Sequence, residues 1–228
     1  MKFFSDGFPG TTLNATKWSY GYAGEPTGQL FGTPSYATNA EVVVNNGLSL
    51  NATNGSAGEY SVGCINSLNK FNGGANGGWI QAEIKMPTAQ DGLWAGWWLC
   101  PVSSFDGGQP WEVDCEWIGS DPNTVYFTLH GAGGAQIAQF KVTCSTLSTT
   151  FHDYTFNWIV PKAGHPGTLQ FLFDGVLAGQ VTNAPVCTEW FMVLDLCVST
   201  GQWPGNTSNG AMIPTSTMHV NYVTVEGN

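Results

Sequence analysis

Short runs of alternating apolar and polar residues, separated by turn-forming residues, constrain the fold of this chain more than any other feature. The clearest runs are residues 40–44, 48–50, 79–86, 168–173 and 219–225. Two of the intervening turns, Asn45-Asn46-Gly47 and Asp174-Gly175, are typical of hairpins. No window holds an apolar period of 3.6 residues over three turns. The pattern predicts an all-β protein, an antiparallel sandwich with its core between two sheets.

The whole chain is expected to form one domain over residues 1–228. Its length suits a single sizeable core, and no linker, repeat or low-complexity tract divides it. No apolar run approaches the roughly 20 residues of a membrane span, and Met1-Lys2-Phe3-Phe4 is too short for a signal peptide. Only 10% of the residues are charged, and Thr, Ser, Asn and Gly are abundant instead. Such a composition is typical of the surface of an extracellular protein. We expect a secreted monomer.

The charge balance restricts the partners. Sixteen acidic residues face six lysines, arginine is absent, and the formal net charge is −10. Nucleic acids and anionic membranes are bound mainly through cationic side chains, so both are excluded as partners. Without arginine there is no bidentate clamp for sulfate, phosphate or carboxylate groups. The partner is therefore expected to be an uncharged molecule.

The six cysteines are Cys64, Cys100, Cys115, Cys144, Cys187 and Cys197. They show no C-x-x-C spacing, so we expect no zinc site and no other metal that catalysis requires. In a secreted protein they could form up to three disulfides. The alternative is that they are small buried thiols in strands.

The segment Trp111-Glu112-Val113-Asp114-Cys115-Glu116-Trp117 carries the chemistry. Side chains alternate along a strand, so the three acids share one face and their apolar neighbours point toward a core. A row of like charges raises the pKa of each member and is costly, which favours a functional role over a solvated acidic edge.

The spacing of these acids suits glycoside hydrolysis. Glu112 and Glu116 stand about 13 Å apart at their Cα atoms, and inward-leaning side chains could bring the carboxyl groups to about 5–6 Å. That separation is typical of a retaining glycosidase, whereas an inverting enzyme needs roughly 6.5–9.5 Å for an intervening water. Asp114, between them, can hydrogen-bond the nucleophile.

Tryptophans supply flat apolar surfaces that suit sugar rings. By alternation Trp94 and Trp98 share one face of a strand, where we expect them to line a cleft, whereas Trp97 faces away into the core. Trp203 lies between glycine and proline in a predicted loop, where either binding or packing would explain it.

These segments, taken in order, resemble glycoside hydrolase family 16, the laminarinase and lichenase group. The similar segments include Phe8-Pro9-Gly10, Ile84-Lys85-Met86-Pro87, the Gly92 to Leu99 strand, Glu112 to Glu116, Thr128-Leu129-His130, Phe151 to Trp158 and Val220-Asn221-Tyr222-Val223. The resemblance implies a curved β-jelly-roll with a substrate groove on its concave sheet. It makes Glu112 the nucleophile, Glu116 the acid/base and Asp114 the assisting acid.

The resemblance also suggests residues that bind substrate. Asn39 and Asp195 align with groove-lining positions, Asn66 stands where lichenases usually place an arginine, and His130 lies beside the catalytic acids. Asn221 replaces an aspartate often tied to a structural calcium, so a calcium ion is expected to be weakly held if it is present at all.

The predicted function is endo-acting, retaining hydrolysis of a neutral β-glucan with β-1,3 or mixed β-1,3/1,4 linkages. A transglycosylase of the same family would use the same residues, and sequence does not separate the two. A lectin-like binding module shares the sandwich and the aromatic residues, but it has no need of three acids along one strand.

Overall fold

The computed structural model describes residues 2–22, 27–55, 58–71, 77–102, 112–160, 167–184, 189–202, 205–206 and 215–227. Helical structure in these residues is of the 3-10 type alone and includes two short turns, η1 (Asn39–Glu41) and η3 (Ala132–Gly134). None of their helices is long and apolar enough to cross a membrane. The all-β prediction is confirmed.

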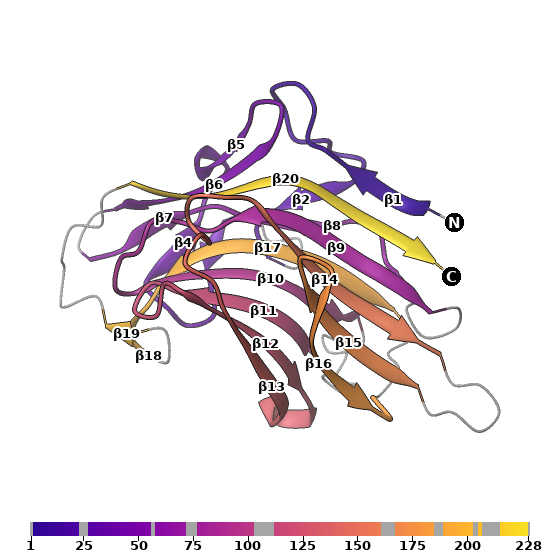
Figure 1. Cartoon of the computed structure of the whole chain (residues 1–228). Coiled ribbons are helices and arrows are strands. Elements are labelled where there is room, and N and C mark those ends of the chain that lie inside the picture. Colours follow the sequence, from indigo (N-terminus) through magenta and orange to yellow (C-terminus); the bar gives the residue numbers. More distant parts are fainter. Residues whose placement is uncertain are drawn as a thin grey trace.

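Two curved sheets form the body of the molecule (Figure 1). The smaller has the order β13-β12-β11-β10-β17-β8-β2 and carries the candidate site. Its strands are β2 (Trp18–Tyr20), β8 (Cys64–Ser67), β10 (Leu93–Pro101), β11 (Glu112–Ile118), β12 (Thr124–His130), β13 (Gln136–Thr143) and β17 (Trp190–Val198). All of its neighbouring strands are antiparallel.

The larger sheet has eleven strands and covers the inner face of the smaller one. They are β1 (Lys2–Asp6), β3 (Gly28–Gln29), β4 (Ser35–Ala37), β5 (Val42–Val44), β6 (Leu48–Asn54), β7 (Tyr60–Val62), β9 (Gly78–Lys85), β14 (His152–Ile159), β15 (Thr168–Phe173), β16 (Val176–Thr182) and β20 (Ser216–Gly227). One pair, β4 with β7, is parallel, an exception to the predicted antiparallel pattern. A separate pair, β18 (Thr200–Gln202) with β19 (Gly205–Asn206), lies off both sheets.

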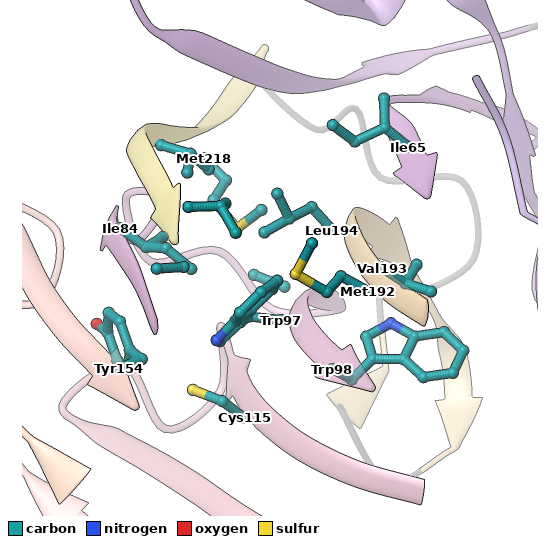
Figure 2. Close-up of a cluster of buried hydrophobic side chains, with 14 of the residues drawn as sticks. Ile65, Ile84, Trp97, Trp98, Cys115, Tyr154, Met192, Val193, Leu194 and Met218 are labelled. Carbon is teal, nitrogen blue, oxygen red and sulfur yellow. The ribbon is translucent and has the colours of Figure 1, made fainter. Parts of the chain in front are cut away.

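The core lies between the inner faces of the two sheets. Trp97 is fully buried there and stacks on Phe156, with 6.1 Å between ring centroids. Figure 2 shows it beside Ile84 and Met218 of the larger sheet and Cys115 of the smaller one. The prediction that Trp97 points away from its neighbours Trp94 and Trp98 is therefore confirmed.

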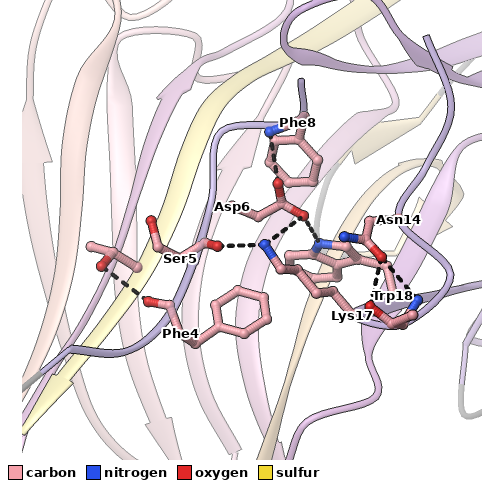
Figure 3. A network of polar contacts seen from close by, with 9 residues as sticks. Phe4, Ser5, Asp6, Phe8, Asn14, Lys17 and Trp18 are labelled. Atoms are coloured by element: carbon pink, nitrogen blue, oxygen red, sulfur yellow. Dashed lines mark hydrogen bonds and ion pairs between the residues drawn. The ribbon is translucent and has the colours of Figure 1, made fainter. Parts of the chain in front are cut away.

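A buried carboxylate fastens the N-terminal strand across the sandwich. Asp6, 3% exposed, accepts hydrogen bonds from the backbone N–H of Phe8 and from Nε1 of Trp18, both at 2.9 Å. Lys17 completes the network with Nζ at 3.8 Å from Asp6 and a hydrogen bond to the carbonyl of Ser5 (Figure 3). Because β1 pairs with β20 and Trp18 begins β2, Asp6 links the two sheets.

The predicted hairpin turn between β15 and β16 is confirmed. Asp174 and Gly175 both adopt positive φ angles, 49° and 74°, as a tight two-residue turn between twisted strands requires. Asp174 is held in place because one of its carboxylate oxygens lies 2.7 Å from Nδ1 of His152. His152 therefore has a structural role in this hairpin.

Of the two alternatives that the sequence left open for the cysteines, the structure has the thiols. Cys64, Cys100, Cys115, Cys144 and Cys197 form no disulfide, and Cys187 lies outside the described residues. All but Cys144 are buried in strands, where a thiol packs as a small apolar side chain. Core packing, without disulfides among these five, holds their strands together.

The two ends of the described chain lie side by side. Lys2 pairs with Glu226 across β1 and β20, and Figure 1 shows both termini at the same edge of the molecule.

Candidate active site

The catalytic strand β11 divides its side chains between the core and the opposite, outer face. Val113, Cys115 and Trp117 are fully buried in the core, whereas Glu112, Asp114 and Glu116 lie on the outer face. The pairing of β11 with β10 and β12 is regular, without a bulge. The alternation predicted from the sequence therefore holds over the whole motif.

The three acids line a pocket of about 200 Å³ on the outer face of the smaller sheet. Its other lining residues are Tyr22, Phe31, Trp94, Gly96, Trp98 and Asp195. Trp94, Gly96 and Trp98 come from β10 and Asp195 from β17, so strands on one side of β11 build most of the wall. The pocket combines carboxyl groups with aromatic rings, as expected of a site for a sugar chain.

Asp114 is the most buried of the three acids. It is 3% exposed, and one of its oxygens lies 3.1 Å from Nε2 of His130, the residue at the end of β12. A carboxylate oxygen of Glu112, a carboxylate oxygen of Asp114 and an imidazole nitrogen of His130 all lie within 4.8 Å of one another. Burial raises the pKa of Asp114 well above its usual range, and the charges of Glu112 and Glu116 raise it further. Asp114 can therefore hold a proton and donate it in a hydrogen bond to a neighbouring carboxylate.

The neighbours of Glu112 partly offset the effect of burial on its pKa. Burial raises its pKa, and the nearby His130 lowers it. Glu112 lies directly opposite His130 in the β11–β12 pairing. Of the two glutamates, Glu112 is the one beside a group that can carry positive charge, which suits an ionised nucleophile.

Glu116 has the complementary character. Burial and the charge of Glu112 raise its pKa to about 8, although a hydrogen bond from Trp94 Nε1 to its Oε1, 3.1 Å long, acts in the opposite direction. At neutral pH this carboxyl group is therefore protonated. A general acid must carry its proton at the working pH, and Glu116 meets that condition.

Trp98 lines the pocket beside Trp94, as expected from the sequence, but most of its ring is covered. It is only 8% exposed, because Tyr22 stacks on it with 5.4 Å between ring centroids and 27° between planes. Its Nε1 donates to Oδ1 of Asp195 at 2.7 Å. Trp94 is partly exposed and has Phe31 as its aromatic neighbour. Trp94 offers the more accessible ring, and Trp98 forms part of the wall behind it.

Sequence reasoning missed three residues of the pocket: Tyr22, Phe31 and Gly96. Tyr22 and Phe31 follow β2 and β3, far along the chain from the acids, and no local pattern marks them. Gly96 did carry a signal, since it stands on the strand face shared by Trp94 and Trp98. A Cβ atom at this position would lie 2.6 Å from Oδ1 of Asp195, so only glycine leaves room for that carboxyl group.

Other predicted site residues lie apart from the pocket or outside the described chain. Asn66 is buried on β8, opposite Val193, and Asn39 is exposed in η1, beside the larger sheet. Neither is among the residues lining the pocket. The register nevertheless puts Asn66 on the same face as the acids, in one cross-strand row with Trp98 and Asp114. A role in substrate binding stays a prediction for both residues. Trp203 lies outside the described residues.

The sequence profile described as "Glycosyl hydrolases family 16" matches residues 33–224 of this chain. This chain belongs to glycosyl hydrolase family 16. The family inferred from the motifs is thereby confirmed, and the strand that carries Glu112, Asp114 and Glu116 lies inside the matched region.

The family 16 chain is similar to proteins of known name and to solved structures. It is 28% identical to glucan endo-1,3-beta-glucosidase A1 of Niallia circulans, over 97% of this chain and 37% of that protein. It is 27% identical to a beta-glucanase of Paenibacillus polymyxa, over 89% of this chain and 80% of that protein. The chain thus spans little more than a third of the Niallia protein. Its fold is similar to that of endo-beta-1,3-glucanase from Pyrococcus furiosus, with a TM-score of 0.81 and 22% identity over 99% of this chain and 94% of that one.

A metal ion finds little support around the described residues. The donor atoms that come close enough together are those of Glu112, Asp114 and His130, which the candidate chemistry already uses. On the opposite side of the molecule, Nδ2 of Asn221 donates to Oε2 of Glu83 at 2.6 Å. This hydrogen bond engages the amide nitrogen of Asn221, whereas a calcium ion would be bound through its carbonyl oxygen. The calcium suggested by the resemblance therefore stays a prediction.

Proposed function

We propose that this family 16 chain cuts internal bonds of a neutral β-glucan with retention of configuration. The observation that carries the proposal is the contrast between two glutamates on one face of β11. Glu112 lies beside His130, whereas Glu116 has a pKa of about 8. One glutamate is suited to attack and the other to donate a proton, the division of labour in a retaining glycosidase.

The proposed reaction has two steps. Glu112 attacks the anomeric carbon while Glu116 gives its proton to the leaving glycosidic oxygen, which forms a glycosyl ester on Glu112. Glu116, now a carboxylate, then takes a proton from water, and that water displaces Glu112. Protonated Asp114 donates a hydrogen bond to Glu112 and stabilises it as a leaving group in the second step.

The charge of the pocket supports a neutral substrate. Four carboxyl groups line it, and its lining residues include no lysine and no histidine. His130 lies outside this lining, 3.1 Å from Asp114. A sulfated or acidic polysaccharide would meet repulsion there. A glucan needs only hydroxyl hydrogen bonds and ring stacking, which the acids, Trp94 and Tyr22 can supply. We therefore favour β-1,3-glucan or mixed β-1,3/1,4-glucan over carrageenan and porphyran.

The remaining proposals concern context. Low charge and many small polar residues support secretion. We also propose that the chain works as a monomer without a cofactor, because the carboxyl groups supply the acid, base and nucleophile.

Two other functions would use the same pocket. A transglycosylase would pass the glycosyl group from Glu112 to a second sugar instead of water, and would make products longer than its substrate. A lectin would bind glucan without release of reducing ends. The raised pKa of Glu116 favours a catalyst, since binding alone gains nothing from a buried proton donor.

A panel of polysaccharides tests the proposal. Laminarin, lichenan, barley glucan, xyloglucan, agarose and carrageenan would be assayed at low ionic strength, where repulsion is least screened. We expect reducing ends from laminarin, lichenan or barley glucan, with mid-sized oligosaccharides appearing first, as internal cutting requires. Faster release from carrageenan than from every glucan would overturn the charge argument. Binding without release would identify a lectin, and elongated products a transglycosylase.

A further inference from the structure

Asp195 is a buried acid without a cationic partner among the described residues. It is 2% exposed and lies on β17, one strand beyond β10. Its Oδ1 accepts from Nε1 of Trp98 at 2.7 Å, and its Oδ2 accepts from the thiol of Cys197 at 3.1 Å. Two neutral donors satisfy the carboxylate but do not cancel its charge, which makes Asp195 a source of negative potential inside the pocket.

The sheet register places Asp195 on the same cross-strand row as Glu116. Gly96 pairs with Asp195 on one side and with Glu116 on the other. Gly96 itself puts no side chain between the two acids, and a Cβ atom at this position would lie 2.6 Å from Oδ1 of Asp195. The carboxyl group of Asp195 therefore occupies the space above Gly96, between β17 and the strand that carries Glu116.

We propose that Asp195 is a positioning residue that fixes the ring of Trp98 and, as an anion across Gly96, keeps the proton on Glu116. This inference rests on the proposed function, since it gives Glu116 the role of general acid. It assigns to Asp195 an electrostatic role that is distinct from the substrate contact expected from the sequence.

Electrostatics within the pocket agree with this role. The titratable groups that face Asp195 are Glu112 and Glu116 from β11, Cys64 from β8 and Cys197 from its own strand. Burial raises the pKa of Asp195 to about 6, while the hydrogen bonds from Trp98 and Cys197 restrain that rise. Asp195 is therefore ionised above about pH 6, and its charge contributes to the raised pKa of Glu116.

The test is the Asp195→Asn variant, which keeps the shape and an acceptor for Trp98 but removes the charge. We expect the alkaline limb of the pH profile of kcat/KM to move down by about 0.3 to 0.5 pH unit, since Glu116 then releases its proton more easily. Glu59→Gln is the matched control, because it also removes one negative charge, from an exposed residue before β7. Its alkaline limb should not move.

A second measurement does not depend on the substrate. In protein labelled with 13C at the glutamate carboxyl groups, the resonance of Glu116, assigned with Glu116→Gln, reports its pKa directly. We expect a lower pKa in Asp195→Asn than in the unchanged chain. If no polysaccharide is cut, the proposed function fails. The titration of Glu116 would still show whether Asp195 raises its pKa.

Asp195→Ala serves as a second neutral variant if Asp195→Asn does not fold. An unchanged pKa of Glu116 in a folded neutral variant would overturn the proposal. So would a loss of activity at every pH with the limb unmoved, which is the result expected of a purely structural residue.

Discussion

Trp94 donates its indole N–H to Oε1 of Glu116 over 3.1 Å, so the more accessible of the two pocket tryptophans is tied to the proposed proton donor. The same side chain that offers a ring to the substrate thus also influences the acid. A hydrogen bond to a carboxylate stabilises the ionised form, and this one lowers the pKa of Glu116 against the opposing effect of burial.

Replacement of Trp94 should therefore move the pH profile upward. In Trp94→Phe the ring remains but the donor is lost, so the pKa of Glu116 rises above its present value of about 8. We expect the alkaline limb of kcat/KM to shift up by about half a pH unit. This direction is opposite to that expected for Asp195→Asn, and a downward shift would contradict the role given to the hydrogen bond.

The two catalytic glutamates should each be indispensable. Glu112→Gln and Glu116→Gln keep the shape of the side chain and should lower kcat by about three orders of magnitude or more. Release of reducing ends from the best glucan measures the loss, and circular dichroism checks the fold. Azide should restore turnover of an activated aryl glycoside by Glu116→Ala and give a β-glycosyl azide. Activity near the original level in either Gln variant would refute the assignment.

The stereochemistry of the first product should be retained. Glu112 and Glu116 project from one regular strand without a bulge, an arrangement that lets the side chains converge. Proton NMR during the first minutes of hydrolysis should show the β-anomer before mutarotation. An initial α-anomer would instead indicate a single displacement by water.

Stability should fall as the pH rises through the titration of Glu116. Its pKa is raised in the folded chain from the usual 4.5 to about 8, so its stabilising contribution is complete below about pH 4.5 and is lost by about pH 8. The free energy of unfolding should decrease over this window by an amount on the order of a few kcal/mol. Urea unfolding at several pH values measures it. Glu116→Gln should show a shallower decrease, and an equal slope would contradict the buried titration.

The attachment of the N-terminal strand β1 to β2 should contribute to stability through Asp6 more than through Lys17. Asp6→Ala leaves the donors of Trp18 and Phe8 without their acceptor, at a cost of about 2–4 kcal/mol in the free energy of unfolding. Lys17→Ala removes a partly exposed cation at 3.8 Å and should cost under about 1 kcal/mol. Urea unfolding compares them, and equal losses would argue against a bridging role for the carboxylate.

The sequence predicted best what depends on short-range periodicity. Alternation along β11 separated Glu112, Asp114 and Glu116 from the core residues between them, and alternation along β10 placed Trp97 inside. Both predictions need only the two-residue repeat of a strand. Asp174-Gly175 likewise predicted its hairpin from local turn chemistry.

Contacts between distant segments could not be predicted in this way. Tyr22 covers Trp98 because the chain after β2 crosses to the outer face of β10, which no local pattern encodes. Alternation therefore placed Trp98 correctly in the wall of the pocket but could not show that another ring covers it. The choice between disulfides and buried thiols stayed open for a related reason, since cysteine spacing does not show which strands become neighbours.

The pairing of Lys2 with Glu226 brings the two ends of the chain together, away from the strands that carry the acids. A linker of a few residues would join them, and a new start could be cut at Asp174-Gly175, in the hairpin between β15 and β16. Such a circular permutant would leave β10, β11, β12 and β17 uncut and in their present register. The order in which the strands are synthesised is thus separable from the catalytic face they build.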